Sequence, residues 1–182
     1  MQIQVDRHIV IRSWRLEDAE RTAQFANNRK VSINLRDTFP YPYTLADAES
    51  YLRHVTTAKP ETGFAIGNEE GAIGGIGLVL GADVHRKTAE LGYWLGEPFW
   101  GQGIMSRVVS TFVGWAFDTF DLHRVFADPY SSNPASARVL EKNGFSLEGI
   151  KRCSAVKEGV VLDQLLYART RVGLVVGMEV EI

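Results

Sequence analysis

A scarcity of cysteine is the first notable feature of this sequence, because Cys153 is the only cysteine among 182 residues. A lone cysteine excludes an intrachain disulfide and a cysteine-based metal cluster, and it suits a reducing compartment. The chain also lacks an apolar run that approaches the roughly 20 residues a membrane-spanning helix requires. Its first residues do not show the pattern of a secretory signal. We therefore expect a cytoplasmic protein with no metal ion and no membrane partner.

Charge of either sign is not in excess. The sequence has 20 Lys and Arg against 22 Asp and Glu, a formal net charge of −2, whereas nucleic-acid-binding domains normally carry a basic excess. Hydrophobic residues make up 45% and charged residues 23%, as in ordinary soluble globular proteins. We expect no nucleic-acid partner, and we expect a single domain over residues 1–172.

Short strand-like segments alternate with helical segments along the chain. Apolar patterns predict strands at 8–14, 89–96, 124–130, 146–159 and 160–172, and a hairpin over 63–81 that turns at 68–71. Helical periodicity predicts helices at 16–28, 45–58, 104–120 and 135–143, of which the third has an apolar face that should pack on a sheet. This order indicates an α/β (α+β) protein that lacks the regular repeat of a doubly wound fold.

Three positions favour the beginning or end of a predicted helix. Thr44 precedes the second helix as an N-cap would. Asn133 precedes Pro134, which suits the first helical position, so the Asn133 side chain can accept a hydrogen bond from the amide of Ser136. Gly144 follows the last helix as a C′ glycine would. A capping role alone is sufficient to explain Asn133 and Ser136.

The segment FWGQGIMS at 99–106 joins a strand-like segment to a helical one through Gly101 and Gly103. Such a loop presents unpaired backbone amides and the positive end of a helix dipole, which together suit a phosphate. A tight turn whose glycines only supply positive φ is the simpler alternative. Two known phosphate loops do not match, because Gly-Lys-Ser/Thr is absent and Ser106 stands where a third glycine would be.

Three segments occur in the order found in one family: AELGYWLGEPFWGQGIMS at 89–106, HRVFADPYSSNPASARVLEKNGF at 123–145 and VLDQLLYAR at 161–169. Together they resemble the GNAT acyltransferase superfamily, and within it the RimJ/RimL-like N-acetyltransferases, over nearly the whole chain. The resemblance implies a strongly twisted mixed sheet of about seven strands flanked by about four helices. It also implies that acetyl-CoA is the co-substrate.

The resemblance places acetyl-CoA between the strands at 89–96 and 124–130, which would separate there. The pantetheine arm would pair with backbone groups of Trp94, Leu95 and Gly96. In this arrangement the phosphates of acetyl-CoA, at the other end of the cofactor from the thioester, would lie at the glycine loop.

The glycine loop is then the expected seat of the diphosphate, whose oxygens could reach the main chain beside the glycines. The residues assigned to it are Trp100, Gly101, Gln102, Gly103, Ile104, Met105 and Ser106. The resemblance further implies that Asn133 contacts the pantetheine arm.

Two residues are assigned to the chemistry of acetyl transfer. An amine is mostly protonated at neutral pH and must lose a proton before it attacks a thioester, so Glu90, beside the expected cleft, is the predicted base. His123 and Asp163 are alternatives. The resemblance implies that Ser136 protonates the departing thiolate, because Leu140 stands where many family members have a tyrosine.

The predicted function is acetyl-CoA-dependent N-acetyl transfer to a primary amine, either a protein N-terminus or a small molecule, by direct attack in a ternary complex. A non-catalytic acyl-CoA-binding regulatory protein and a phosphate-binding protein of another kind are alternatives. Both a monomer and a homodimer are open. The apolar tail at 173–182 is expected to form an additional strand or a dimer contact.

Overall fold

The computed structural model describes residues 1–173, and these form one eight-stranded sheet in the order β1-β2-β3-β4-β5-β6-β8-β7. The strands are β1 (Gln2–Gln4), β2 (Val10–Ser13), β3 (Gly63–Asn68), β4 (Gly71–Leu80), β5 (Thr88–Leu95), β6 (Arg124–Ala127), β7 (Ser146–Lys157) and β8 (Val160–Thr170). The α-helices are α1 (Ala19–Ala26), α2 (Arg29–Ser32), α3 (Leu45–Val55), α4 (Ile104–Thr119) and α5 (Pro134–Lys142). Neighbouring strands are antiparallel except for β5 and β6, which are parallel.

The mixed sheet with helices on both faces confirms the predicted fold class, with one strand and one helix more than expected. The additional elements are β1 and α2, which have three and four residues and are therefore too short to show a period in the sequence. Strand β6 ends at Ala127, earlier than expected, and only Tyr130 continues as an isolated bridge to Gln164.

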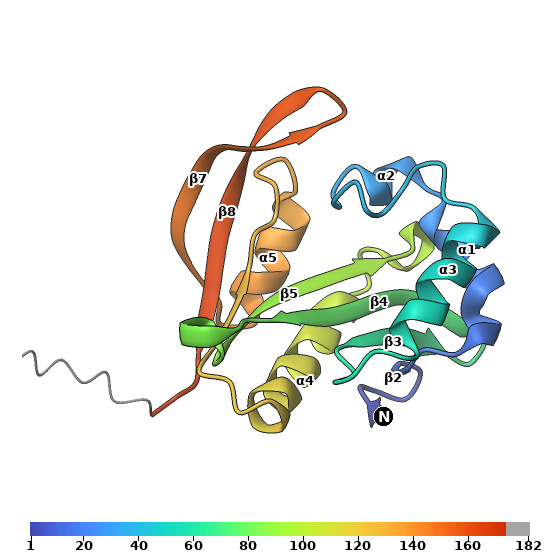
Figure 1. Cartoon of the computed structure of the whole chain (residues 1–182), viewed down its shortest axis with the longest axis horizontal. Helices are drawn as coiled ribbons and strands as arrows, with labels where there is room; N and C mark the ends of the chain where they lie inside the picture. The colour runs from blue at the N-terminus through green and yellow to red at the C-terminus, as the bar shows by residue number, and fades with distance from the viewer. Residues whose placement is uncertain (174–182) are drawn as a thin grey trace, which may run out of the picture.

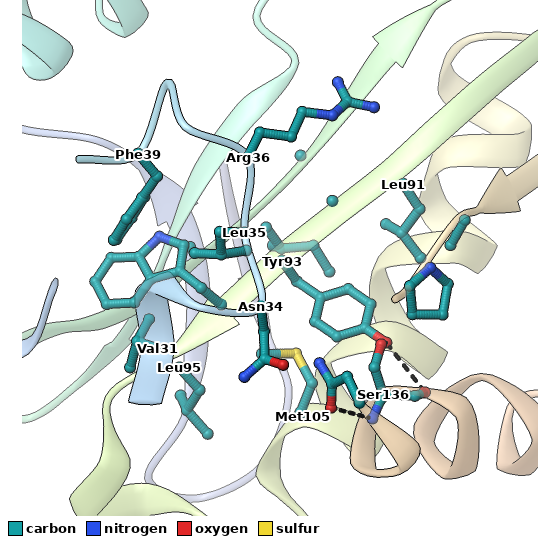
Figure 2. A pocket seen from close by; sticks show the side chains of 18 of the residues that line it. Val31, Asn34, Leu35, Arg36, Phe39, Leu91, Tyr93, Leu95, Met105 and Ser136 are labelled. Atoms are coloured by element: carbon teal, nitrogen blue, oxygen red, sulfur yellow. Dashed lines mark hydrogen bonds between the residues drawn. The ribbon is translucent and has the colours of Figure 1, made fainter. Parts of the chain in front are cut away.

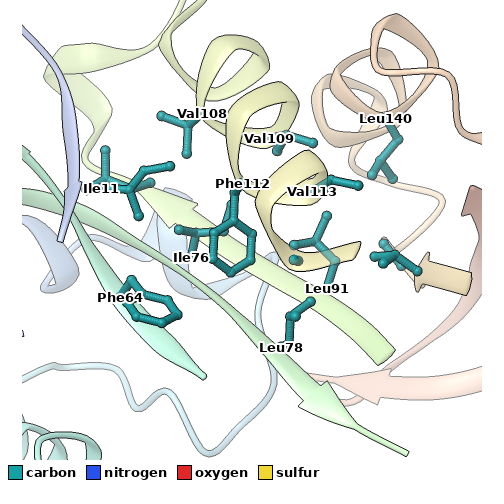
Figure 3. Close-up of a cluster of buried hydrophobic side chains, with 14 of the residues drawn as sticks. Ile11, Phe64, Ile76, Leu78, Leu91, Val108, Val109, Phe112, Val113 and Leu140 are labelled. Atoms are coloured by element: carbon teal, nitrogen blue, oxygen red, sulfur yellow. The ribbon is translucent and has the colours of Figure 1, made fainter. Parts of the chain in front are cut away.

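Two apolar cores hold the helices to the sheet. On one face, α4 and α5 contribute Val108, Phe112 and Leu140, each with no exposed surface, to a cluster with the strands (Figure 3). On the other face, α1 and α3 pack on β3 and β4, with Ala26 and Leu52 fully buried. The predicted apolar face of the 104–120 helix is confirmed by this packing.

The caps predicted from the sequence are present. Thr44 accepts a hydrogen bond from the amide of Asp47, and the Asp47 carboxylate accepts one from the amide of Thr44, which completes a capping box. Asn133 caps α5, and Gly144 has a φ of 74° directly after the C-cap residue. Local patterns of this kind depend on a few neighbouring residues, which is why the sequence predicts them well.

Figure 1 shows the consequence of this topology for the site. The β7–β8 hairpin and α5 lie to one side, α1–α3 lie to the other, and β4 and β5 run between them. Within residues 1–173, no helix combines the length and the apolar character needed to cross a bilayer. The predicted tail beyond Gly173 lies outside the described residues.

Candidate active site

A cleft opens where β5 and β6 stop pairing. The last paired residues are Glu90 and Phe126, after which β5 continues to Leu95 while β6 ends at Ala127. The cavity at this opening has a volume of about 1330 Å³ and reaches from the α2–α3 connection to α5 (Figure 2). The separation of the two strands therefore agrees with the arrangement expected from the sequence.

The register of β5 decides which of its main-chain groups face the cleft. Gly96 N–H donates to Ile73 O at 2.9 Å, and Gly81 N–H donates to Thr88 O at 2.8 Å, so the even-numbered residues of β5 bond to β4. The odd-numbered residues turn their N–H and C=O groups to the opposite edge, where β6 pairs only as far as Glu90. That edge is the wall of the cleft.

This parity corrects part of the sequence-based assignment. The main-chain groups of Trp94 and the amide of Gly96 turn toward β4, and the Gly96 carbonyl accepts a hydrogen bond from the amide of Phe99 at 3.0 Å. The main-chain groups of Leu91, Tyr93 and Leu95 turn to the opposite edge, where the last pair with β6 is at Glu90. The carbonyl of Leu95 already accepts a hydrogen bond from the indole N–H of Trp100 at 2.7 Å, whereas the amide of Leu95 is on the open edge.

The glycine loop closes one end of the cleft. Gly101 and Gly103 have φ of 75° and 69°, so both glycines are needed for backbone conformations that other residues rarely adopt. A Cβ at Gly101 would meet no atom within 4 Å, which leaves open space beside the main chain. Gly103 is the N-cap of α4, and no side chain caps this helix. The first amides of α4 are therefore available to an anion.

Two cations line the cavity near this loop. Arg138 and Lys142 both lie on α5, and among the described residues neither forms an ion pair or a side-chain hydrogen bond. Arg107 is engaged, since it pairs with Asp6 at 2.8 Å and donates to Gln102 O. The cavity thus offers positive charge as well as free amides to a phosphorylated ligand.

Ser136 is fixed at the start of α5, on the side of the cleft that faces β5. Its amide donates to Asn133 Oδ1 at 3.2 Å, and its Oγ lies 2.8 Å from the hydroxyl of Tyr93. Burial raises the pKa of Tyr93 to about 12, against a smaller lowering by the hydrogen bond with Ser136. The phenol is therefore neutral at physiological pH.

We expect Asn133→Ala to lower the free energy of unfolding by about 1 kcal/mol, because it removes the cap that satisfies the Ser136 amide. Asn133→Ser keeps a capping oxygen and serves as the matched control. Urea unfolding of the two variants measures the difference. Equal stability of Asn133→Ala and the unchanged protein would contradict the capping role.

Glu90 lines the same cavity on the face of β5 that is turned toward α1–α3. Its Oε1 forms an ion pair with Arg36, which lies in the connection between α2 and α3. The hydrogen bond to Glu90 raises the pKa of Arg36, with a smaller coulombic contribution from the same carboxylate. Only Oε1 is engaged in this pair, and among residues 1–173 the second oxygen, Oε2, forms no hydrogen bond.

Apolar side chains form the wall of the cavity that faces α2 and α3. Phe39 packs against Tyr43 and Trp94, with ring centroids 4.8 and 5.5 Å apart. Val31 and Leu35 continue this wall toward α2 (Figure 2). A ligand that approaches Glu90 from this side passes an apolar and aromatic surface.

The structure brings most of the predicted site residues to the cavity. The predicted residues that line it are Glu90, Trp94, Leu95, Trp100, Gly101, Gly103, Ile104, Met105, Ser106, Asn133 and Ser136. Gly96 and Gln102 are not among the lining residues, and the Gln102 side chain donates to Pro98 O at 3.1 Å.

The alternative bases are not at the cleft. His123 and Asp163 do not line the cavity, and Asp163 accepts hydrogen bonds from Arg152 and from the amide of Cys153. Tyr167 does not line the cavity, and its hydroxyl donates to Glu141 at 2.7 Å. Within residues 1–173, no group of three or more His, Cys, Asp or Glu side chains is arranged to hold a metal ion.

Tyr93 and Arg36 are among the residues of the site that were not predicted from the sequence. Tyr93 lies inside the segment AELGYWLG. Its side chain alternates onto the same face of the strand as those of Leu91 and Leu95, and this alternation is the signal that could have identified it. Arg36 has no such signal, because its contact with Glu90 joins residues 54 positions apart.

Comparison with known proteins gives a family match. The model of the acetyltransferase (GNAT) domain matches residues 8–146. The uncharacterized N-acetyltransferase YoaA of Bacillus subtilis (strain 168) is 36% identical over 96 residues, which are 53% of this chain and 54% of that protein. The ribosomal-protein-serine acetyltransferase of Escherichia coli (strain K12) is 37% identical over 84 residues, which are 46% of this chain and 47% of that protein. Each of these two matches spans about half the length of the relative.

A solved structure has the same fold. RimL, a ribosomal L7/L12 alpha-N-protein acetyltransferase in complex with coenzyme A, superposes with a TM-score of 0.83 and 22% identity over 93% of this chain and 98% of the other. At this level of identity, the likeness establishes the fold alone. The expected mixed sheet with flanking helices is confirmed by it.

Proposed function

The chain belongs to the acetyltransferase (GNAT) domain family, and from this premise we propose that it transfers the acetyl group of acetyl-CoA to a primary amine by direct attack in a ternary complex. The observation that carries the proposal is the cleft itself. A free strand edge, a glycine loop at a helix start and a carboxylate line one cavity of about 1330 Å³. Acetyl-CoA, as the co-substrate, needs a site for its diphosphate and one for its thioester.

The open edge of β5 suits the pantetheine arm. The carbonyl of Leu91, both main-chain groups of Tyr93 and the amide of Leu95 lie beyond the last pair with β6, where they can pair with the amides of the arm as a neighbouring strand would. The side chain of Trp94 belongs to the apolar wall that it forms with Phe39. Asn133 lines the cavity from the start of α5, opposite β5. The thioester carbonyl would then be polarised by a main-chain N–H of β5.

The glycine loop and α5 suit the phosphates. The amides at the start of α4 and its helix dipole favour a diphosphate beside Gly101 and Gly103. Arg138 and Lys142 supply positive charge to the same cavity. The open space where a Cβ at Gly101 would lie supports this placement, because a phosphate could approach the main chain there.

Glu90 and Ser136 carry the proposed chemistry. Glu90 accepts the proton of the attacking amine through the oxygen that Arg36 does not engage, either directly or through water. Ser136 donates its hydroxyl proton to the sulfur as the thiolate departs. Holding both substrates in one cleft accounts for transfer without a covalent enzyme intermediate.

The acceptor is proposed to be an amine on a protein N-terminus or on a small molecule. The similarity to a ribosomal-protein-serine acetyltransferase supports the former. The apolar wall of Val31, Leu35 and Phe39 would contact the atoms next to the amine. Acetyl-CoA and this acceptor are the proposed partners of a cytoplasmic enzyme.

A panel of acceptors tests this function. Acetyl-CoA is supplied with a peptide that has a free N-terminal serine, the same peptide acetylated at its N-terminus, spermidine or free amino acids, and released CoA thiol is followed. The exposed Cys153 adds at most one thiol per chain, which a reaction without acceptor corrects. Acceptor-dependent thiol release and an acetylated product are expected. Acetyl-CoA binding without transfer to any acceptor would favour the regulatory protein.

We expect Ser136→Ala to lower kcat by about 10²-fold, at the lower limit of what a general acid contributes. The melting temperature should change little, because Asn133 caps the amide and not the hydroxyl of Ser136. Steady-state kinetics and a melting curve on the same preparation measure the two effects. An unchanged kcat would leave Ser136 with the capping role alone.

A further inference from the structure

We propose that Tyr93 is a positioning residue that holds the Ser136 hydroxyl ready to donate its proton to the CoA thiolate. The inference rests on the proposed function and goes beyond it, because it assigns a role to a residue of β5 that the sequence did not mark. Tyr93 and Ser136 line the same cavity from opposite elements, and their hydroxyls face each other (Figure 2).

Ser136 is held from two directions. Asn133 accepts a hydrogen bond from its amide at 3.2 Å, and the Tyr93 hydroxyl lies 2.8 Å from its Oγ and 3.4 Å from its carbonyl oxygen. The ring of Tyr93 is packed against the core formed by β5 and α4. A hydroxyl with these contacts has few alternative orientations, so it is preorganised.

The direction of the Tyr93–Ser136 hydrogen bond follows from acidity. A phenol is more acidic than an aliphatic hydroxyl, and burial keeps the Tyr93 phenol protonated at physiological pH. The phenol therefore donates to Ser136 Oγ, which leaves the proton of Ser136 free to point elsewhere. Leu140, one turn further along α5, is fully buried and has no proton to offer.

The proposed step is balanced in atoms and charge. The amine nitrogen forms a bond to the acetyl carbon, the carbon–sulfur bond breaks, and its electron pair remains on sulfur. Ser136 passes its proton to sulfur while Tyr93 keeps its phenolic proton and donates its hydrogen bond to the Ser136 oxygen. Glu90 takes the proton from the amine and releases it to water, and a proton from water restores the Ser136 hydroxyl.

Binding of CoA provides a test that does not require turnover. Calorimetry measures the affinity for CoA, which has a thiol, and for acetyl-CoA, which has none, between about pH 7 and pH 10, across the range where a thiol near pKa 8.5 ionises. The proteins are the unchanged chain, Tyr93→Phe and Ser136→Ala. The matched control is Tyr167→Phe, which removes a hydroxyl bonded to Glu141 outside the cavity.

We expect the affinity of the unchanged protein for CoA to rise with pH by about tenfold relative to acetyl-CoA, as a hydrogen bond to a charged group would give. Tyr93→Phe and Ser136→Ala should lose most of this rise, and Tyr167→Phe should keep it. Binding of acetyl-CoA should be the same in all four proteins. An equal rise in all four would overturn the inference and leave the proposed function intact.

Other outcomes separate the two claims. If neither ligand binds the unchanged protein, the proposed function fails first. If Tyr93→Phe proves poorly folded, Ser136→Ala with Tyr93 intact still measures the thiolate preference, and its full retention would overturn the inference. With an active acceptor, kcat should fall in Tyr93→Phe at unchanged KM for acetyl-CoA. The double variant should be no slower than Ser136→Ala alone, and additive losses would contradict a role through Ser136.

Discussion

A Gly103→Val variant is expected to bind acetyl-CoA at least tenfold more weakly than the unchanged protein. Gly103 has a φ of 69° at the N-cap of α4, a conformation that a β-branched residue adopts only at a cost of about 1–2 kcal/mol. A side chain here would also meet Arg107, whose nitrogen lies 3.2 Å from the position of a Cβ. The start of α4 would move away from the diphosphate that it is proposed to bind.

The control is Gly114→Ala in the same helix. Gly114 lies in the interior of α4, and a Cβ there meets nothing within 4 Å. This substitution should stabilise the helix by about 0.5–1 kcal/mol and leave the affinity for acetyl-CoA unchanged. Calorimetric titration with acetyl-CoA and a melting curve decide the outcome. A folded Gly103→Val protein of unchanged affinity would remove the glycine loop from the binding site.

Glu90→Gln is expected to lower kcat by about 10²–10⁴-fold, the usual loss when a general base is removed. Glutamine has the shape of glutamate but cannot accept the proton of the amine. The affinity for acetyl-CoA should change little, because the Glu90 side chain lies on the face of β5 that is turned toward α1–α3 and not on the strand edge proposed for pantetheine. Steady-state kinetics at several pH values measure the loss, and a decrease under about threefold at all of them would make Glu90 a bystander.

Arg36→Gln separates two explanations of that loss. If Glu90 acts only by holding Arg36 through their ion pair, both substitutions should lower kcat equally. If Glu90 is the base, Arg36→Gln should have the smaller effect, because the carboxylate remains in the cavity. Equal losses of kcat would mean that Glu90 acts only by holding Arg36 and is not the base.

Local sequence patterns predicted the parts of the site that neighbouring residues determine. The cap of Asn133 on Ser136 spans three positions, and the positive φ of Gly101 and Gly103 follows from the absence of a side chain. The helix that begins after Gly103 was predicted to within one residue of its end, because its apolar face extends over four turns.

Contacts between distant segments were not predicted. The pair of Arg36 with Glu90 and that of Tyr93 with Ser136 depend on how the α2–α3 connection and α5 meet β5 in space. The same reason explains why the sequence predicted that the main chain of Trp94 faces the cleft, whereas in the structure the main chain of its odd-numbered neighbours does so. Alternation gives the face of each side chain, but only pairing with β4 and β6 decides which N–H and C=O groups remain free.

A crystal structure of the protein with CoA tests the proposed cleft most directly. We expect the pantetheine arm along the edge of β5, hydrogen-bonded to main-chain groups of Leu91 and Tyr93, and the diphosphate on the amides that follow Gly101. The sulfur should lie within about 3.5 Å of Ser136 Oγ, the distance of a hydrogen bond that involves sulfur. CoA bound outside the opening between β5 and β6, or a sulfur distant from both Ser136 and Glu90, would contradict acetyl transfer at this site.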